Sequence, residues 1–563
     1  MSNHHENDTP IHLDAVVIGA GLSGIASLYR LRKAGLKVKA FEAGSGFGGV
    51  WFWNRYPGAR VDSEYPLYQL NIPEAHQSWD WDYKFPAQKE LSDYFNHLDK
   101  VLDLSKDVYF NSEVTSVRYR DGLWTVRTAQ RTATCKYLAL AAGALHRTHR
   151  PDFPGLDNFG GEIYHTASWP DDIDLQGKRV AVIGAGATGV QVVQELAKQV
   201  DYLLVCVRNP SYCLPMGQKK ISDEEKVATR AHVQETLCQV RNTLAGYPAK
   251  QSPGSLWDRS TEEREALWET LFAQGGFNFL QGNYNEMLVD PKANREIYNF
   301  WAKKTRARVT DPVKRDIIAP VEPPYPFGTR RTPLDQDYYE CLNQSNVELI
   351  SLRDTPIARF NKSGFIAEDG KQKDFDVLVL ATGFDSFTGS LTTMGLKTKD
   401  GLDIQDVWKD GVRTYLGIFV KGLPNAFLLY SPQAPTALAN GPTLIECQAD
   451  IMMETIQRLE SIKAKSIEPK ESAEAEWGEL LEKMISPTLF RYAGSWWNGA
   501  NIPGKKVQIF NYVGGLATYE KTCQEAVSTW KGFDIILDHH SEPVSQKTVK
   551  GSEEADLIKP IAA

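Results

Sequence analysis

Short apolar segments rich in β-branched residues recur along the chain, and two of them open the same pattern of strand, turn and helix. Residues 15–18 (AVVI) and 179–183 (RVAVI) have the length and composition of strands buried on both faces of a parallel sheet. A glycine-rich turn follows each strand, and a segment of helical composition follows each turn, ending at residue 33 in the first case and spanning 190–196 in the second. Second strands are expected at residues 37–41 and 202–207. The pattern predicts an α/β fold with two Rossmann-like dinucleotide-binding domains.

The first glycine-rich turn favours FAD or NAD over NADP. It contains Gly19, Gly21, Ser23 and Gly24. The glycines let the backbone turn tightly and approach a pyrophosphate, whose charge is met by N–H groups at the helix N-terminus. The next strand ends at Glu42, eighteen residues after Gly24. A carboxylate at this position accepts hydrogen bonds from a ribose diol and repels a 2′-phosphate.

In the second unit, the position that contacts the ribose carries a positive charge, whereas in the first unit it carries a negative one. Its residues are Gly184, Gly186, Ala187, Thr188 and Gly189. The strand after it ends at Arg208 instead of an acid. Because a guanidinium makes bidentate contacts with phosphate, we expect this unit to bind NADPH. One glycine motif alone is weak evidence for a nucleotide, but two in full strand, turn and helix context are specific.

Length and composition agree with a multidomain globular protein that acts on small molecules. A chain of 563 residues is too long to fold around one hydrophobic core. Its hydrophobic fraction of 42% and charged fraction of 24% are typical of globular proteins. A formal net charge of −8 gives no general attraction to nucleic acid or anionic membranes. No apolar run approaches the roughly 18 residues of a membrane helix. The seven cysteines show neither C-x-x-C pairs nor metal-like spacing, so we expect reduced thiols, no metal site and a cytoplasmic protein.

Residues 159–170 carry a more specific signal. They read F-x-G-x-x-x-H-x-x-x-W-P, with His165 and Trp169 at the two characteristic later positions. This segment resembles the fingerprint of type I Baeyer–Villiger monooxygenases, a group of class B flavoprotein monooxygenases. Because a linker between domains is an unusual place for direct chemistry, we expect His165 and Trp169 to couple domain position to NADPH delivery.

Two further segments resemble motifs of the same family. Residues 48–62 are too aromatic and irregular for a helix or strand face and are expected to form an ordered loop. The resemblance places Trp51 beside the flavin and Asp62 near a catalytic arginine. Residues 326–335 resemble the family's active-site segment, which makes Arg331 the catalytic arginine and lets Arg330 help Arg208 hold the 2′-phosphate. A basic pair without these flanking matches would be read as a solvated surface.

The resemblance also implies contacts with the two cofactors from scattered positions. Residues 494–505 are similar to a loop that closes over NADP, with Trp496 as the contact and Trp497 as packing. Residues 431–441 are similar to a loop facing the flavin ring, which ends at Gly441. The remaining implied contacts are Val50, Trp53, Arg60, Tyr68, Val114, Gln191 and Asn209.

Apolar strands at residues 137–143 and 376–384 resemble the points where such chains pass between the two domains. The first has Ala142 where a threonine is usual, which changes a local hydrogen bond and not the fold. Residues 217–326 contain charged, helix-favouring stretches and are expected to form a helical insertion in the NADP domain. The expected division is as follows: FAD domain, 1–147 and 385–536; NADP domain, 148–216 and 327–384; helical insertion, 217–326; polar tail, 537–563.

The implied activity is oxidation of a ketone to an ester or lactone with NADPH and O2. In the family, NADPH reduces FAD, O2 adds to form a flavin C4a-peroxide, and the peroxide attacks the carbonyl. Arg331 would stabilise the negative charge and Asp62 would orient Arg331. Sulfoxidation is a possible side activity. Linear, cyclic and aryl ketones, the oligomeric state and the physiological pathway all stay open.

Three other classes of protein share parts of this pattern. A flavin monooxygenase that oxygenates nitrogen or sulfur is the nearest alternative, although the residues around Trp169 and Arg331 favour ketone oxidation. A flavin disulfide reductase needs a redox cysteine pair, which the spacing of the cysteines does not provide. A nucleotide sensor without catalysis is the third alternative, because a fold does not fix a function.

Overall fold

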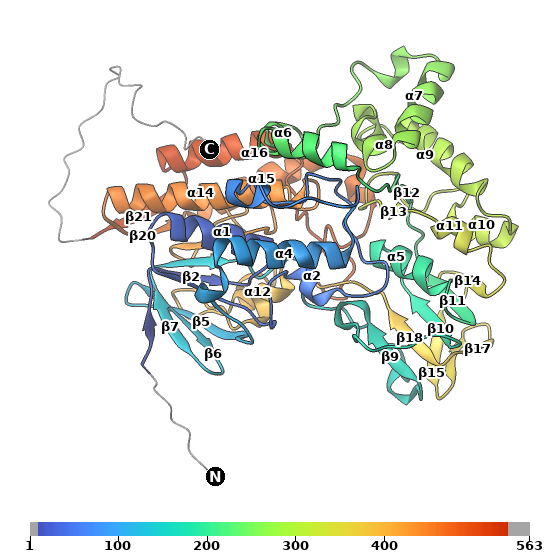
Figure 1. Cartoon of the computed structure of the whole chain (residues 1–563), viewed down its shortest axis with the longest axis horizontal. Helices are drawn as coiled ribbons and strands as arrows, with labels where there is room; N and C mark the ends of the chain where they lie inside the picture. Colours follow the sequence, from blue (N-terminus) through green and yellow to red (C-terminus); the bar gives the residue numbers. More distant parts are fainter. Residues whose placement is uncertain (1–8, 539–563) are drawn as a thin grey trace, which may run out of the picture.

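Two five-stranded parallel sheets carry the two glycine-rich turns in the computed structural model, which describes residues 9–538. The first sheet has the order β19-β8-β2-β3-β4 and the second has the order β14-β11-β10-β18-β9. Figure 1 shows the first sheet on the left, the second at the lower right, the helices of residues 261–318 above the second, and the helix of residues 223–241 at the top centre. The prediction of an α/β fold with two Rossmann-like units is confirmed.

The strands of the two sheets come from distant parts of the chain. The first sheet contains β2 (Ala15–Ile18), β3 (Val38–Phe41), β4 (Val108–Tyr109), β8 (Tyr137–Leu140) and β19 (Ala426–Leu428). The second contains β9 (Glu162–His165), β10 (Arg179–Ile183), β11 (Tyr202–Val207), β14 (Val347–Ser351) and β18 (Val377–Leu380). All pairs within both sheets are parallel. The first sheet is therefore completed by a strand that follows every strand of the second.

Alternation along the central strands explains the layers on both faces of each sheet. In β2, Ala15 and Val17 pack into a core with α1 (Leu22–Lys33) and α14 (Gly441–Ser461), whereas Val16 and Ile18 pack against a small mixed sheet, in which only the β1–β7 pair is parallel. That sheet contains β1 (Ile11–His12), β5 (Val114–Arg120), β6 (Leu123–Thr128) and β7 (Thr132–Cys135). Side chains of successive strand residues point to opposite faces, so an entirely apolar strand needs both layers.

The second sheet repeats this arrangement. Val180 and Val182 of β10 face α5 (Ala187–Leu196), and Ala181 and Ile183 face the opposite core, which contains Phe360. A three-stranded antiparallel sheet covers this second side: β15 (Ile357–Asn361), β16 (Gly364–Ala367) and β17 (Gln372–Asp374). Other short elements near this unit are β12 (Leu214–Pro215), β13 (Leu334–Asp335) and α11 (Tyr338–Cys341).

Helices dominate the segment expected to be an insertion and the end of the described chain. The first group is α6 (Asp223–Arg241), α7 (Thr261–Gln274), α8 (Asn278–Gln281), α9 (Pro291–Arg306) and α10 (Pro312–Ile318). The second group is α12 (Gly389–Thr393), α13 (Ile404–Val407), α15 (Glu471–Ile485) and α16 (Leu516–Thr529), with β20 (Ala464–Pro469) and β21 (Phe533–Leu537) as an antiparallel pair. Helices α3 (Pro73–His76) and α4 (Gln88–Leu102) complete the first unit. Serines at the starts of α6 and α7 form capping boxes with glutamates three residues later, which fixes where both helices begin.

Three details differ from the expectations. The segment 48–62 contains one helical turn, α2 (Val50–Trp53), because Gly48 and Gly49 adopt positive φ values that turn the chain into it. The segment 159–170 is not a free linker, since its residues 162–165 form the edge strand β9 of the second sheet. Leu537 belongs to β21, and residues 539–563 of the expected polar tail lie outside the described residues.

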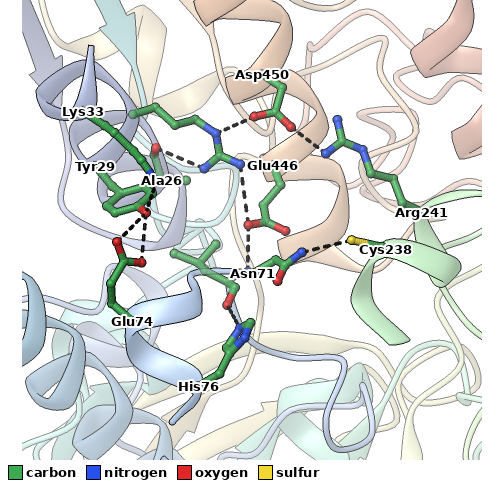
Figure 2. A network of polar contacts seen from close by, with 12 residues as sticks. Ala26, Tyr29, Lys33, Asn71, Glu74, His76, Cys238, Arg241, Glu446 and Asp450 are labelled. Atoms are coloured by element: carbon green, nitrogen blue, oxygen red, sulfur yellow. Dashed lines mark hydrogen bonds and ion pairs between the residues drawn. The ribbon is translucent and has the colours of Figure 1, made fainter. Parts of the chain in front are cut away.

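A network of charged side chains ties the predicted insertion to the first unit (Figure 2). Arg30 of α1 donates from Nε to Asp450 Oδ1 of α14 at 2.6 Å, and Arg241 of α6 donates to Asp450 Oδ2 at 2.5 Å. Arg241 also pairs with Glu520 of α16 at 2.5 Å. Glu446, one turn before Asp450, lies 3.6 Å from Arg30. Four helices from distant parts of the sequence thus share one ionic contact region.

Candidate active site

One cavity of about 380 Å³ lies between the two glycine-rich turns. Most of the predicted site residues line it: Gly19, Gly21, Ser23, Glu42, Val50, Trp51, Trp53, Arg60, Asp62, Tyr68, Val114, Ala187, Thr188, Gln191, Arg331, Gly441 and Trp496. Gly184, Gly186, Arg208, Asn209 and Arg330 are not part of this lining. Gly24 and Gly189 are not part of it either, because each packs its helix against the turn before it. A Cβ on either glycine would lie about 2 Å from the carbonyl oxygen of Gly19 or Gly184. Its volume is in the range of pockets that bind small organic molecules.

The first turn has the shape and charge that a flavin dinucleotide requires. A Cβ on Gly21 would lie 3.2 Å from Gly49 Cα, so a side chain there would narrow the floor of the cavity. Glu42 is buried and accepts N–H bonds from Ala20 and Gly44, both at 2.7 Å. Burial raises the pKa of Glu42, while these backbone bonds oppose the rise. Each carboxylate oxygen retains a lone pair for a ribose hydroxyl, so the residues fit FAD.

The second turn is open where the first is packed. A Cβ on Gly186 would meet no atom within 4 Å, which leaves space for a pyrophosphate at the start of α5. Arg208 and Asn209 directly follow β11, at the carboxyl edge of the second sheet. Arg330 lies with its Cζ 4.0 Å from the centre of the Tyr325 ring, and its buried Nε has no acceptor among residues 9–538. This edge is therefore positively charged and fits NADP.

Arg331 is held in one orientation by Asp62. Its Nε and one terminal nitrogen donate to the two oxygens of Asp62 at 2.9 and 2.8 Å, and the other terminal nitrogen donates to the Ala437 carbonyl at 2.9 Å. Burial lowers the pKa of Arg331, but Asp62 outweighs this effect and the net shift is upward. The guanidinium is therefore a permanent, fixed positive charge in the cavity wall.

Three aromatic residues that the sequence did not single out surround this pair. The Phe277 ring lies 4.9 Å from Arg331 Cζ, and the Tyr247 ring lies 5.9 Å from the Phe277 ring. Tyr247 also shares a 2.6 Å hydrogen bond with Ser63, next to Asp62. Tyr430 is the third aromatic residue, and it lines the cavity. Burial raises the pKa of Tyr430, and the positive charge of Arg331 opposes this rise. No local motif marks Tyr247 or Phe277, because only the folding of the helical segment brings them to Arg331.

Gln191 joins the two units through its own hydrogen bonds. It accepts from the Tyr56 hydroxyl at 2.8 Å and donates to the Arg60 carbonyl at 3.0 Å. Burial raises the pKa of Tyr56 to about 12. Gln191 was predicted as a cofactor contact, but in the structure its amide holds α5 against the segment after α2.

Aromatic residues close other parts of the wall. Trp51 donates from Nε1 to the Tyr68 hydroxyl at 2.9 Å. Trp496 lines the cavity and stacks on Phe387, with ring centres 5.6 Å apart. Trp497 points elsewhere and packs on Phe490 at 5.5 Å. The two adjacent tryptophans thus have different surroundings, and the NADP contact expected of Trp496 stays a prediction.

His165 and Trp169 lie away from the Arg331 pair. His165 ends β9 and accepts the Ala167 N–H at Nδ1. Its ring lies 6.0 Å from that of Phe384, which lines the cavity, and buried Trp169 packs on Tyr164. This placement gives the two residues structural contacts at the edge of the second sheet.

Comparison with known proteins gives the family. A family model described as "Flavin-binding monooxygenase-like" matches residues 14–234. The cyclopentanone 1,2-monooxygenase of Comamonas sp. is 38% identical across 95% of this chain and 97% of its own, and a Baeyer-Villiger monooxygenase of Pseudooceanicola batsensis is 34% identical across 94% and 97%. The chain belongs to the Baeyer–Villiger monooxygenase family. This confirms the family predicted from residues 159–170.

Solved structures and one further relative refine the comparison within the Baeyer–Villiger family. A closed crystal structure of cyclohexanone monooxygenase superposes with a TM-score of 0.90 at 35% identity, covering 94% of this chain and 100% of that one. A structure described as an OTEMO complex with FAD and NADP has a TM-score of 0.89 at 34% identity, with the same coverage. Phenazine N-monooxygenase PhzNO1 of Lysobacter antibioticus, 35% identical across 95% and 98%, shows that N-oxygenation also occurs on a chain of this kind.

Proposed function

We propose that this chain oxidises ketones to esters or lactones by a Baeyer–Villiger reaction that consumes NADPH and O2, with FAD as its bound cofactor. The observation that carries the proposal is the fixed Arg331–Asp62 pair in a cavity that both glycine-rich turns border. The whole-length relationship to ketone monooxygenases and to a structure with FAD and NADP supports the same assignment.

The two turns would hold the two cofactors in separate ways. Gly19, Gly21 and Glu42 would bind the pyrophosphate and ribose of FAD, and Arg208 and Arg330 would bind the 2′-phosphate of NADPH. Bound FAD supplies the activation of O2 with electrons taken from NADPH. The remaining chemistry depends on what the side chains do to the ketone and to water.

Arg331 would stabilise negative charge that develops on the oxygen of the ketone. Asp62 and the Ala437 carbonyl fix the guanidinium before the substrate arrives, so little reorganisation is needed during the reaction. One well-placed donor of this kind contributes on the order of 3 kcal/mol to the stabilisation of a transition state. Trp496, Tyr430 and neighbouring apolar groups would keep water from the reacting atoms.

The same observations support proposals about organisation and location. We assign residues 1–147 and 385–536 to an FAD domain, and 148–216 and 327–384 to an NADP domain with a helical insertion at 217–326. All seven cysteines lie in the described range and are unpaired, which favours a reducing compartment such as the cytoplasm. Within residues 9–538, no helix combines the length and the apolar composition that crossing a membrane requires.

Product analysis tests the function directly. The purified yellow protein would be supplied with NADPH and a panel of linear, cyclic and aryl ketones, one sulfide and one aromatic N-heterocycle. We expect NADPH consumption that depends on a ketone and matches the amount of ester or lactone formed. N-oxide formation without any ester would instead assign the chain to the N-oxygenating relatives, and no oxygenated product with any substrate would reject both activities.

A further inference from the structure

A third arginine lies beside the two that were assigned to the 2′-phosphate. Strands β11 and β14 are parallel neighbours with Val207 opposite Ser351, so the loops after them start at the same edge of the sheet. The register continues beyond the strands, because the Leu352 N–H donates to the Val207 carbonyl at 2.8 Å. Arg353 follows at once and donates a hydrogen bond to the side-chain oxygen of Asn209.

Unlike Arg331 and Arg241, these three arginines have no carboxylate partner in the part of the chain that the structure describes. Within residues 9–538, Arg208, Arg330 and Arg353 form no ion pair, whereas Arg331 and Arg241 each lie within 3 Å of a carboxylate oxygen. Arg330 is the most enclosed of the three, and its buried Nε has no acceptor in the same range. Clustered positive charge without a carboxylate is costly unless an anion joins it.

Electrostatics connects the three guanidinium groups. Burial lowers the pKa of Arg330, the rings of Tyr325 and Tyr212 oppose this, and repulsion from Arg208 and Arg353 adds to the lowering. Both exposed arginines are therefore close enough to act on Arg330. A doubly charged phosphate placed among them would reverse that repulsion, because it attracts all three.

We propose that Arg353 is a third ligand of the NADPH 2′-phosphate and that Asn209 orients its guanidinium. The Asn209 oxygen occupies one of the five N–H donors of Arg353 and leaves the others for phosphate oxygens. Asn209 was predicted as a direct cofactor contact, and in this arrangement it acts through Arg353. The inference rests on the proposed function, since it adds a determinant of the choice between NADPH and NADH.

The experiment measures binding to the oxidised, FAD-loaded enzyme by calorimetry, with 2′,5′-ADP and 5′-AMP as probes. Arg353→Ala should weaken 2′,5′-ADP binding by about tenfold, the equivalent of ~1.4 kcal/mol, and leave 5′-AMP binding unchanged. Arg353→Lys should recover part of the loss, since it restores the charge without the planar fork. Arg359→Ala removes another exposed arginine six residues later, on β15, and should leave both affinities unchanged.

The outcomes separate this inference from the proposed function. Unchanged 2′,5′-ADP affinity in Arg353→Ala, or an equal loss for both probes, would show that Arg353 is only a solvated side chain held by Asn209. A parent enzyme that binds 2′,5′-ADP no better than 5′-AMP would overturn the site as a whole. A selective loss in Arg353→Ala would support the inference even if no ketone were oxidised, because the titration requires neither O2 nor a ketone.

Discussion

Replacing Asp62 tests whether Arg331 works because it is fixed in place and not only because it is charged. Asp62→Ala removes two charge-assisted hydrogen bonds of 2.8 and 2.9 Å and leaves the guanidinium with the Ala437 carbonyl as its one remaining hydrogen-bond acceptor. Arg331 keeps its charge, but its terminal nitrogens gain freedom to rotate. We therefore expect a smaller effect on catalysis than removal of Arg331 itself produces.

The magnitude follows from the burial of the pair. Breaking a fully buried ion pair costs about 3–5 kcal/mol. Because the side chains of Arg331 and Asp62 are 22% and 29% exposed, solvent screening reduces the expected loss of folding stability to roughly 2 kcal/mol. A misoriented donor should lower kcat for ketone oxidation by about 10- to 100-fold, less than the 100- to 1000-fold that removal of a donor causes.

Three measurements on each variant separate the possible causes. Thermal unfolding reports the stability loss, anaerobic reduction of the bound flavin by NADPH reports the hydride step, and ester formation reports the oxygenation. Asp62→Ala should reduce ester formation far more than flavin reduction, Asp62→Asn should lie between it and the parent, and Arg331→Ala should be the most impaired. Ester formation at the parental rate in Asp62→Ala would refute the argument that Asp62 positions Arg331.

Two further predictions concern stability. Arg241→Ala should destabilise the protein by roughly 2–3 kcal/mol, because it removes the cation shared by Asp450 and Glu520. Arg230 lies on the same helix as Arg241, and Arg230→Ala, which breaks an exposed ion pair with Asp80, should cost less than about 1 kcal/mol. Chemical denaturation measures both losses, and equal values would contradict the role given to the network. Asp335 is buried, and although Arg308 opposes the shift, burial raises its pKa from 3.8 to about 6, so the unfolded chain releases this proton at lower pH than the folded protein does. The contribution of protonated Asp335 to the free energy of unfolding is therefore complete below pH 4 and is lost as pH rises through 6. Over this range, the free energy of unfolding of the parent should fall by on the order of 2–3 kcal/mol relative to that of Asp335→Asn. A difference between the two proteins that stays constant with pH would show that the pKa of Asp335 is not raised.

The fold and much of the cavity wall were predictable because their signals are local in the sequence. The apolar runs at β2 and β10 and the glycines after them specify strand, turn and helix within about thirty residues. Arg331 and Asp62 were also predicted, although they are far apart in the chain, because each lies in a segment that resembles a family motif. Neither segment alone reveals the two hydrogen bonds that join them, which are seen in the folded structure.

The sequence did not reveal contacts that depend on how distant segments pack. Tyr247 and Phe277 come from the helical segment, and only its docking on the first unit places them at Arg331. Gln191 was predicted as a cofactor contact and lines the cavity, and the structure adds that its amide holds Tyr56 and the Arg60 backbone. Arg353 is similar, because the register of β14 beside β11 determines where an otherwise ordinary surface arginine lies.

The late position of β19 has a consequence for how the protein is made. This strand pairs with β8 along its free edge, yet the ribosome releases it only after all five strands of the second sheet. Until then, the nascent chain has four of the five strands of this sheet and unpaired backbone groups along β8, a state that favours pairing with other chains. All five strands of the second sheet have been synthesised by that time, so the second unit can fold before the first sheet is complete. A protein released early in synthesis would therefore retain a formed second unit beside an aggregation-prone remnant of the first.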